Sequence, residues 1–221
     1  MRASRSWPAF RVHEHQYNTR NDGFDHRMKS IKFVWASALI MGSVLVTAAA
    51  SAETFRHTIT GEDLKVPDTS LPEGRDTEAA KHFLETGVNL YTEVQGCLPK
   101  GEEIYLTACS GCHGHYGEGK LGPGLADSYW TYPKNKTDKG LFETIYGGAQ
   151  GMMGPHNDHS IDDLLKLMAW IRHMYTGDAA DAEWLTEEQK KSFKPFKPEE
   201  HKPAEGDQVA DAGECKAAAA N

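Results

Sequence analysis

Two cysteines separated by two residues and followed at once by a histidine constrain this chain more than any other feature. The motif is Cys109-Ser110-Gly111-Cys112-His113. This spacing is typical of c-type haem attachment, because two thiols so placed reach the two vinyl groups of one porphyrin while the histidine lies beneath the iron. A single motif predicts one covalent haem c, held by Cys109 and Cys112, with His113 as the proximal iron ligand.

Two other chemistries use a similar pair of thiols, a structural zinc site and a redox-active dithiol. Zinc would require a second pair of ligands at finger-like spacing, and a thioredoxin-type site would require a surrounding parallel sheet. The sequence pattern indicates neither of them. We therefore interpret the motif as a haem site.

The first 52 residues differ in kind from the rest of the chain. Lys29 and Lys32 precede an apolar run over residues 33–46, and Ala50-Ser51-Ala52 has the small-x-small form that signal peptidase cuts. The run is shorter than the roughly 20 residues that span a bilayer, which argues against the alternative of a membrane anchor. We expect a signal peptide over residues 28–52, no membrane span after its cleavage, and an upstream segment, residues 1–27, that reflects a start placed too early.

The charge of the chain excludes one class of partner. Its 221 residues hold 24 Lys plus Arg against 32 Asp plus Glu, a formal net charge of -8. Phosphates would be repelled, so nucleic acid is not an expected partner. Residues 1–52 carry more basic than acidic residues, so the exported chain is more acidic still and suits a basic protein partner.

The spacing of apolar residues predicts an all-α chain. Helices are expected over residues 76–94, 99–109, 137–146, 161–175 and 186–193, with Gly96 ending the first and Ser160 capping the fourth. Residues 53–75 show no sustained period and predict an extended arm, and the Lys, Pro and Glu-rich tail predicts an extended segment. The expected divisions are 1–52 (extension and signal), 53–96 (arm and helix), 97–178 (haem domain) and 179–221 (C-terminal extension).

The proximal histidine needs an acceptor for its second ring nitrogen, so that Nε2 faces the iron. Pro123, in the Gly122-Pro123-Gly124 turn, is well placed to offer its carbonyl; an ordinary surface turn is the alternative. We also expect Trp130, Tyr132 and Trp170 to pack against the porphyrin.

The sixth iron position decides the class of function, because an open position favours gas binding or catalysis and a filled one favours electron transfer. Met152, Met153 and His156 lie together between Gly148 and the expected cap Ser160, and the pattern leaves all three open. Their presence argues against a haem enzyme or gas sensor with an open iron. His159 is expected at the surface beside the crevice.

The two remaining cysteines are Cys97 and Cys215. An exported chain matures in an oxidising compartment, so we expect them to form a disulfide that tethers the tail beside the haem helix. Two free thiols are the alternative.

Longer stretches of the sequence resemble one family. The segments CSGCHGHYGEGKLGPGL, YWTYP, GLFETIYGGAQGMMGPHN and LMAWIRHMYTG resemble cytochrome c-L, the large acidic cytochromes that accept electrons from the quinoprotein methanol dehydrogenase of methylotrophic bacteria. The resemblance extends from about Gly96 to the tail cysteine, and the N-terminal arm is a looser match.

This resemblance implies a class I cytochrome c core around one covalent haem, with an extended N-terminal arm, a disulfide-tethered C-terminal extension and a periplasmic location. It favours Met153 as the sixth ligand and places His156 close enough to replace it. It also implies a calcium ion near a haem propionate, with ligands that the sequence does not identify.

The implied function is electron transfer, with no bond chemistry on this chain. Reduced quinone in methanol dehydrogenase carries two electrons, so each methanol would require two encounters, and each electron would pass on to a smaller class I cytochrome c. The acceptor of the lanthanide-dependent alcohol dehydrogenase is the alternative among electron carriers.

Overall fold

The structure is a computed structural model that describes residues 53–202 and 213–219. The predicted signal peptide and residues 1–27 lie outside the described residues. Within the described ranges the chain forms helices joined by loops, with one isolated antiparallel bridge between Arg56 and Asp63. The all-α prediction is confirmed. No helix in these ranges has both the length and the apolar content needed to cross a membrane.

The helices of the described residues follow one another closely along the chain. The α-helices are α1 (Val66–Thr69), α2 (Glu78–Thr86), α3 (Leu98–Ala108), α4 (Ser110–His113), α5 (Asp138–Gly147), α6 (Ile161–His173) and α7 (Glu187–Ser192), and the 3-10 helices are η1 (Gln95–Cys97), η2 (Pro133–Lys136) and η3 (Ala179–Asp181).

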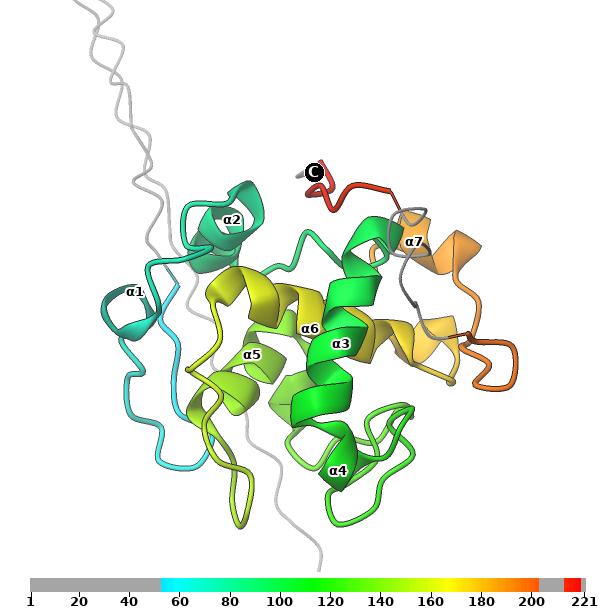
Figure 1. Cartoon of the computed structure of the whole chain (residues 1–221), viewed down its shortest axis with the longest axis horizontal. Helices are drawn as coiled ribbons and strands as arrows, with labels where there is room; N and C mark the ends of the chain where they lie inside the picture. The colour runs from blue at the N-terminus through cyan, green and yellow to red at the C-terminus, as the bar shows by residue number, and fades with distance from the viewer. Residues whose placement is uncertain (1–52, 203–212, 220–221) are drawn as a thin grey trace, which may run out of the picture. The chain divides into compact units, whose positions relative to one another are not determined.

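The centre of the fold is the crossing of α3 and α6, which lie in contact (Figure 1). Gly101 makes the crossing close, because a Cβ at this position would lie 2.2 Å from the Lys166 carbonyl oxygen and 2.9 Å from Trp170 Cβ. The predicted cap of α6 is confirmed, since the Ser160 hydroxyl accepts a hydrogen bond from Asp163 N at 3.1 Å. The close crossing therefore fixes α3 against α6, and with it the position of the attachment motif that follows α3.

The predicted helix over residues 76–94 is wrong in length, because α2 ends at Thr86. Gly87 takes a left-handed conformation with φ of 72° and donates its N–H to Phe83 O, as a C-terminal glycine cap does. Val88, which lies just beyond this cap, is 50% exposed. The apolar residues beyond Gly87 keep helical spacing by coincidence and pack from a loop.

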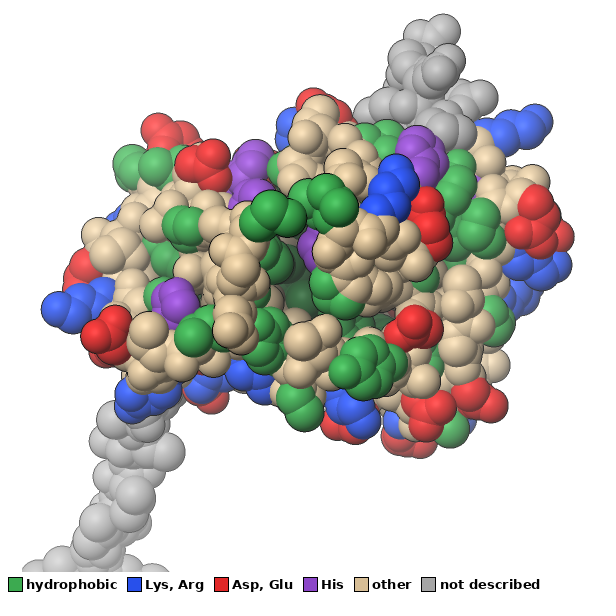
Figure 2. All heavy atoms as spheres, turned by 90° about the horizontal axis from the view of Figure 1, so that it is seen from below, with side chains coloured by type: hydrophobic (Ala, Val, Ile, Leu, Met, Phe, Trp, Pro, Cys, Tyr) green, Lys and Arg blue, Asp and Glu red, His purple; other side chains and the backbone are tan. Residues whose placement is uncertain are grey.

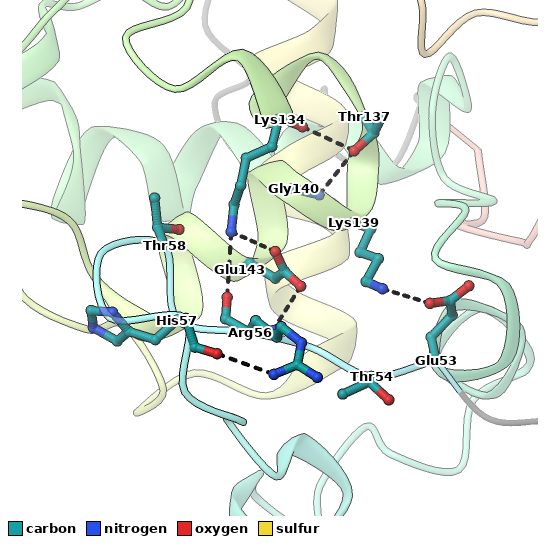
Figure 3. Close-up of a pocket in the computed structure, with 11 residues that line it drawn as sticks. Glu53, Thr54, Arg56, His57, Thr58, Lys134, Thr137, Lys139, Gly140 and Glu143 are labelled. Carbon is teal, nitrogen blue, oxygen red and sulfur yellow. Dashed lines mark hydrogen bonds and ion pairs between the residues drawn. The ribbon is translucent and has the colours of Figure 1, made fainter.

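The N-terminal arm is fastened to α5. Phe55 is buried between Phe83 and Phe142, with ring centroids 5.4 and 5.3 Å away. Beside it, the buried Glu143 carboxylate accepts hydrogen bonds from Arg56 N at 2.7 Å and from Lys134 Nζ at 2.5 Å (Figure 3). The expected extended arm thus lies over the surface, held by an aromatic cluster and a buried carboxylate.

The C-terminal extension is tied down at several points. Cys97 and Cys215 form the predicted disulfide, 118 residues apart in sequence. α7 begins with a capping box, in which Thr186 and Gln189 exchange hydrogen bonds. Between them, His201 Nε2 lies 2.8 Å from the Oε1 of Glu102, a buried residue of α3.

Candidate functional site

A cavity of about 380 Å³ opens where α4, α5 and the loops around them meet. Its volume lies in the range of about 300–1,000 Å³ that is usual for ligand sites. Figure 2 shows the face seen from below, with a hollow lined by hydrophobic side chains. The motif residues Cys109, Cys112 and His113 line this cavity, and so do Met153 and His156. The structure therefore brings the predicted haem residues of two distant segments to one place.

One short turn of helix positions the two thiols and the imidazole. α3 ends at Ala108, and α4 begins directly with Ser110. The N–H groups of Cys112 and His113 both donate to Cys109 O, at 3.1 and 3.0 Å. Burial, and then the neighbouring Cys112, raises the pKa of the Cys109 thiol to about 11. A redox-active dithiol needs a lowered thiol pKa, so this surrounding does not favour that alternative.

The ring of His113 is buried and held from behind. Its Nδ1 lies 2.8 Å from the Pro123 carbonyl oxygen, which can only accept, so Nδ1 carries the proton and Nε2 is left as the metal-binding nitrogen. Gly122 permits this approach, because a Cβ there would lie 2.7 Å from His113 Cε1. The glycine is fixed in turn by its own N–H, which donates to Cys112 O at 2.9 Å.

The loop between α5 and α6 supplies the candidates for the sixth ligand. Met152 is 81% exposed, whereas Met153 is partly buried and packs against the core. His156 is half-buried, and its N–H donates to Ile145 O at 3.0 Å. Burial, aided by His159 and His113 and opposed by Asp158, lowers the pKa of the His156 imidazole. Met153 and His156 thus both line the cavity, and each offers an atom that can bind iron, the thioether sulfur of Met153 and a ring nitrogen of His156.

The remaining walls of the cavity suit a porphyrin. Apolar side chains line it, among them Trp130, Leu141, Ile145 and Ile171. Trp130 is buried, and its indole Nε1 finds no acceptor among the described residues. A buried donor without a partner fits a ligand that carries carboxylates, as haem does. The residues present therefore fit the group that the motif predicts.

The expectation for Trp170 is wrong, whereas Trp130 and Tyr132 line the cavity as expected. Trp170 packs on the other side of α6, with ring centroids 6.0 Å from Phe196 and 5.1 Å from His201. The apolar stripe of α6 is broad enough to face the C-terminal extension as well as the cavity.

Sequence reasoning missed a buried cation behind Trp130. The Arg172 guanidinium lies over the Trp130 ring, 5.2 Å from its centroid, and its Nη2 donates to Asn135 O at 2.8 Å. Its Nε donates to Asp138 at 3.3 Å, in a pair with 0% and 6% of the side chains exposed. A lone Arg in an apolar helix stripe is the available sequence signal, since such a charge needs a buried partner.

A second opening, of about 690 Å³, lies between the N-terminal arm and α5. Figure 3 shows that charged side chains line it. They form two ion pairs, Lys139–Glu53 and Lys134–Glu143, with N···O distances of 2.6 and 2.5 Å. None of the predicted haem residues lines it. We interpret this opening as part of the interface that holds the N-terminal arm against α5.

Comparisons with known proteins show which chains this one is similar to. A family described as "Cytochrome C oxidase, cbb3-type, subunit III" matches residues 98–171. The chain is similar to cytochrome c-L of Methylorubrum extorquens, with 56% identity over 163 residues, 73% of this chain and 80% of that protein. It is also similar to the crystal structure of cytochrome cL from Hyphomicrobium denitrificans, with 62% identity, a TM-score of 0.68, and coverage of 75% of this chain and 99% of that one. For cytochrome CL from the marine methylotrophic bacterium Methylophaga aminisulfidivorans the identity is 55%, the TM-score 0.62, and the coverage 66% of this chain and 96% of that one.

Proposed function

The chain belongs to the cytochrome c-L family, and we propose that it accepts electrons singly from a quinoprotein methanol dehydrogenase in the periplasm and passes them to a smaller class I cytochrome c. As a family member it is a monohaem c-type cytochrome with covalently bound haem c, an electron-transfer protein rather than an enzyme. The cavity shared by Cys109, Cys112, His113 and Met153 is the observation that carries the proposal.

In this proposal each cavity residue has one role. Cys109 and Cys112 hold the haem, His113 is the proximal ligand, and the Pro123 carbonyl fixes the tautomer of that histidine. Met153 is the sixth ligand and His156 the alternative. A bound haem c supplies a one-electron Fe(III)/Fe(II) couple.

The chain's own contribution is to hold the ligands and exclude water. The apolar walls, including Trp130 and Ile145, are buried and lower the dielectric around the site. Met152 and Leu121 line the cavity and are 81% and 77% exposed, so they leave an apolar rim at its mouth where a partner can approach. Two encounters at this mouth are required for each methanol, because the dehydrogenase yields two electrons.

The Met153 assignment is tested by spectroscopy of the ferric holoprotein. Met153→Ala should abolish the charge-transfer band of methionine-bound haem, whereas Met152→Ala is the matched control and should keep it, because Met152 is exposed. An unchanged spectrum in Met153→Ala would move the assignment to His156. The same preparation gives the mass of the mature chain, which should begin at Glu53 and carry one haem.

The partner is tested by stopped-flow reduction of the holoprotein. Purified methanol dehydrogenase should reduce it faster than the lanthanide-dependent alcohol dehydrogenase does. The acidic chain, at -8 in full and more acidic after residue 52, should steer the encounter with a basic surface. Because the Debye length is about 8 Å at physiological ionic strength, added salt should slow the reaction, and a flat or rising rate would contradict electrostatic docking. The calcium ion stays a prediction without assigned ligands.

A further inference from the structure

Three side chains between the haem cavity and α6 form a cluster of metal-binding type. They are His156, Asp158 and His159, and one ligand atom from each lies within 4.8 Å of the other two. His156 lines the cavity, whereas Asp158 and His159 do not. The cluster therefore begins at the cavity rim and extends away from the proposed iron site.

The cluster is built on a short turn with fixed backbone. The His156 N–H donates to Ile145 O at 3.0 Å, and the His159 N–H donates to His156 O at 3.4 Å. The next residue, Ser160, caps α6. The two imidazole rings lie nearly parallel, with 29° between their planes and 6.4 Å between their centroids. The turn thus brings the three groups together before any ion binds.

Among the described residues, hydrogen bonding leaves the ligand atoms of the cluster available to a metal ion. Among the described residues, no hydrogen-bond partner is found for the side chains of His156, Asp158 or His159.

The donor set selects the class of ion. Two imidazoles and one carboxylate suit borderline divalent ions such as Zn²⁺, Cu²⁺ and Ni²⁺, whereas Ca²⁺ and Mg²⁺ prefer oxygen ligands. The positive N-terminal end of α6 opposes a cation. Asp158 in the cluster and Asp163 in the first helical turn offset this term.

We propose that His156, Asp158 and His159 form a binding site for a borderline divalent transition-metal ion at the rim of the haem cavity, with water completing the coordination. One nitrogen of His156 cannot bind iron and the second metal together. The site therefore rests on the part of the proposed function that gives the sixth iron position to Met153.

Zinc titration of the holoprotein tests the site. After treatment with a chelator, the wild-type ferric protein is titrated with Zn²⁺ at pH 7.5 in a calorimeter. We expect one Zn²⁺ per chain, bound at least about tenfold more weakly by His159→Ala and by Asp158→Asn, since each removes one of three protein ligands. His115→Ala is the matched control, because His115 is exposed and lies outside the cluster. Millimolar Ca²⁺ should not displace the zinc.

Two results would overturn the proposal: no zinc binding by the wild-type holoprotein, or equal affinity in wild type and His159→Ala. The haem absorption spectrum of each variant, recorded first, shows that the protein is folded and the iron ligands are unchanged. Reduction by methanol dehydrogenase is measured on the same samples without zinc. It tests the electron-carrier function independently, so failure of one can be told from failure of the other.

Discussion

Gly122→Ala should displace His113, the proposed proximal ligand, without replacing any residue that would bond the haem. In the structure a Cβ at Gly122 would lie 2.7 Å from Cε1, 2.9 Å from Nδ1 and 3.2 Å from Nε2 of His113. Ordinary contact begins at 3.4 Å, so the ring and the loop must separate by about 0.7 Å. Gly122 has no positive φ, so the effect is steric and not one of backbone strain.

Either way of relieving this contact breaks a hydrogen bond. If the ring moves, the 2.8 Å contact between His113 Nδ1 and Pro123 O lengthens. If the loop moves, the 2.9 Å bond from Gly122 N to Cys112 O lengthens. A hydrogen bond of this kind contributes about 0.5–1.5 kcal/mol, which corresponds to about 20–65 mV for a one-electron couple when the loss falls on one redox state.

The direction of the change in reduction potential follows from the chemistry of the imidazole ring. A carbonyl acceptor at Nδ1 makes the imidazole a more basic ligand and so stabilises Fe(III). Loss of the His113–Pro123 contact should therefore raise the reduction potential, by about 20–65 mV. Spectroelectrochemistry of the purified holoprotein measures the change.

The matched control is Gly111→Ala, inside the attachment motif itself. A Cβ at Gly111 meets nothing within 4 Å, and Gly111 has no positive φ. This variant should keep the wild-type potential. The reduction potential could instead be unchanged in Gly122→Ala, or equally shifted in both variants. Either result would refute the argument that the loop of Gly122 and Pro123 positions His113 and so tunes the potential.

The other predictions concern stability, measured by guanidinium unfolding of the ferric holoprotein. Replacing both Cys97 and Cys215 by Ser should lower the free energy of unfolding by up to about 5 kcal/mol, because the disulfide joins residues 118 positions apart in sequence. A loss below about 1 kcal/mol would mean that other contacts already order the tail. His201→Ala should cost about 1–3 kcal/mol, because it leaves the buried Glu102 side chain without its hydrogen-bond partner, and should cost more than Glu102→Gln, which keeps a hydrogen-bonding side chain. Burial, and then His201, lowers the pKa of His173 to about 4, so the unfolded state binds more protons between about pH 6.5 and 4 and stability should fall as pH falls through that window; His173→Gln should flatten this fall, and an unchanged slope would assign it to other groups.

Local signals in the sequence predicted the parts of the fold that local chemistry decides. The attachment motif lies within five residues, and the predicted cap Ser160 bonds a backbone N–H three residues on. The disulfide needed only a count of cysteines and a compartment. The error at Gly87 came from weighing apolar spacing above a glycine stop.

The contacts that sequence reasoning missed join residues far apart along the chain. Glu102 meets His201 across 99 positions, and Arg172 meets Asp138 across 34. No local pattern specifies which partner a buried charge will find, because the choice depends on how the helices cross. Trp170 shows the same limit, since the face of α6 that it occupies is decided by where the tail returns.

The choice between Met153 and His156 depends on movement of the loop that carries both. Ala149 N donates to Met153 O at 3.0 Å and His156 N donates to Ile145 O at 3.0 Å, so each candidate ligand is held by its own backbone bond. A ligand exchange that displaces the loop breaks at least one of these bonds, at about 0.5–1.5 kcal/mol each. Thioether ligation raises the potential and so favours Fe(II), which lets oxidation of the iron weaken the methionine's advantage. Ligand exchange can accompany electron transfer only if the decrease in methionine affinity on oxidation exceeds the free-energy cost of moving the loop. Otherwise we expect the same ligand in both redox states.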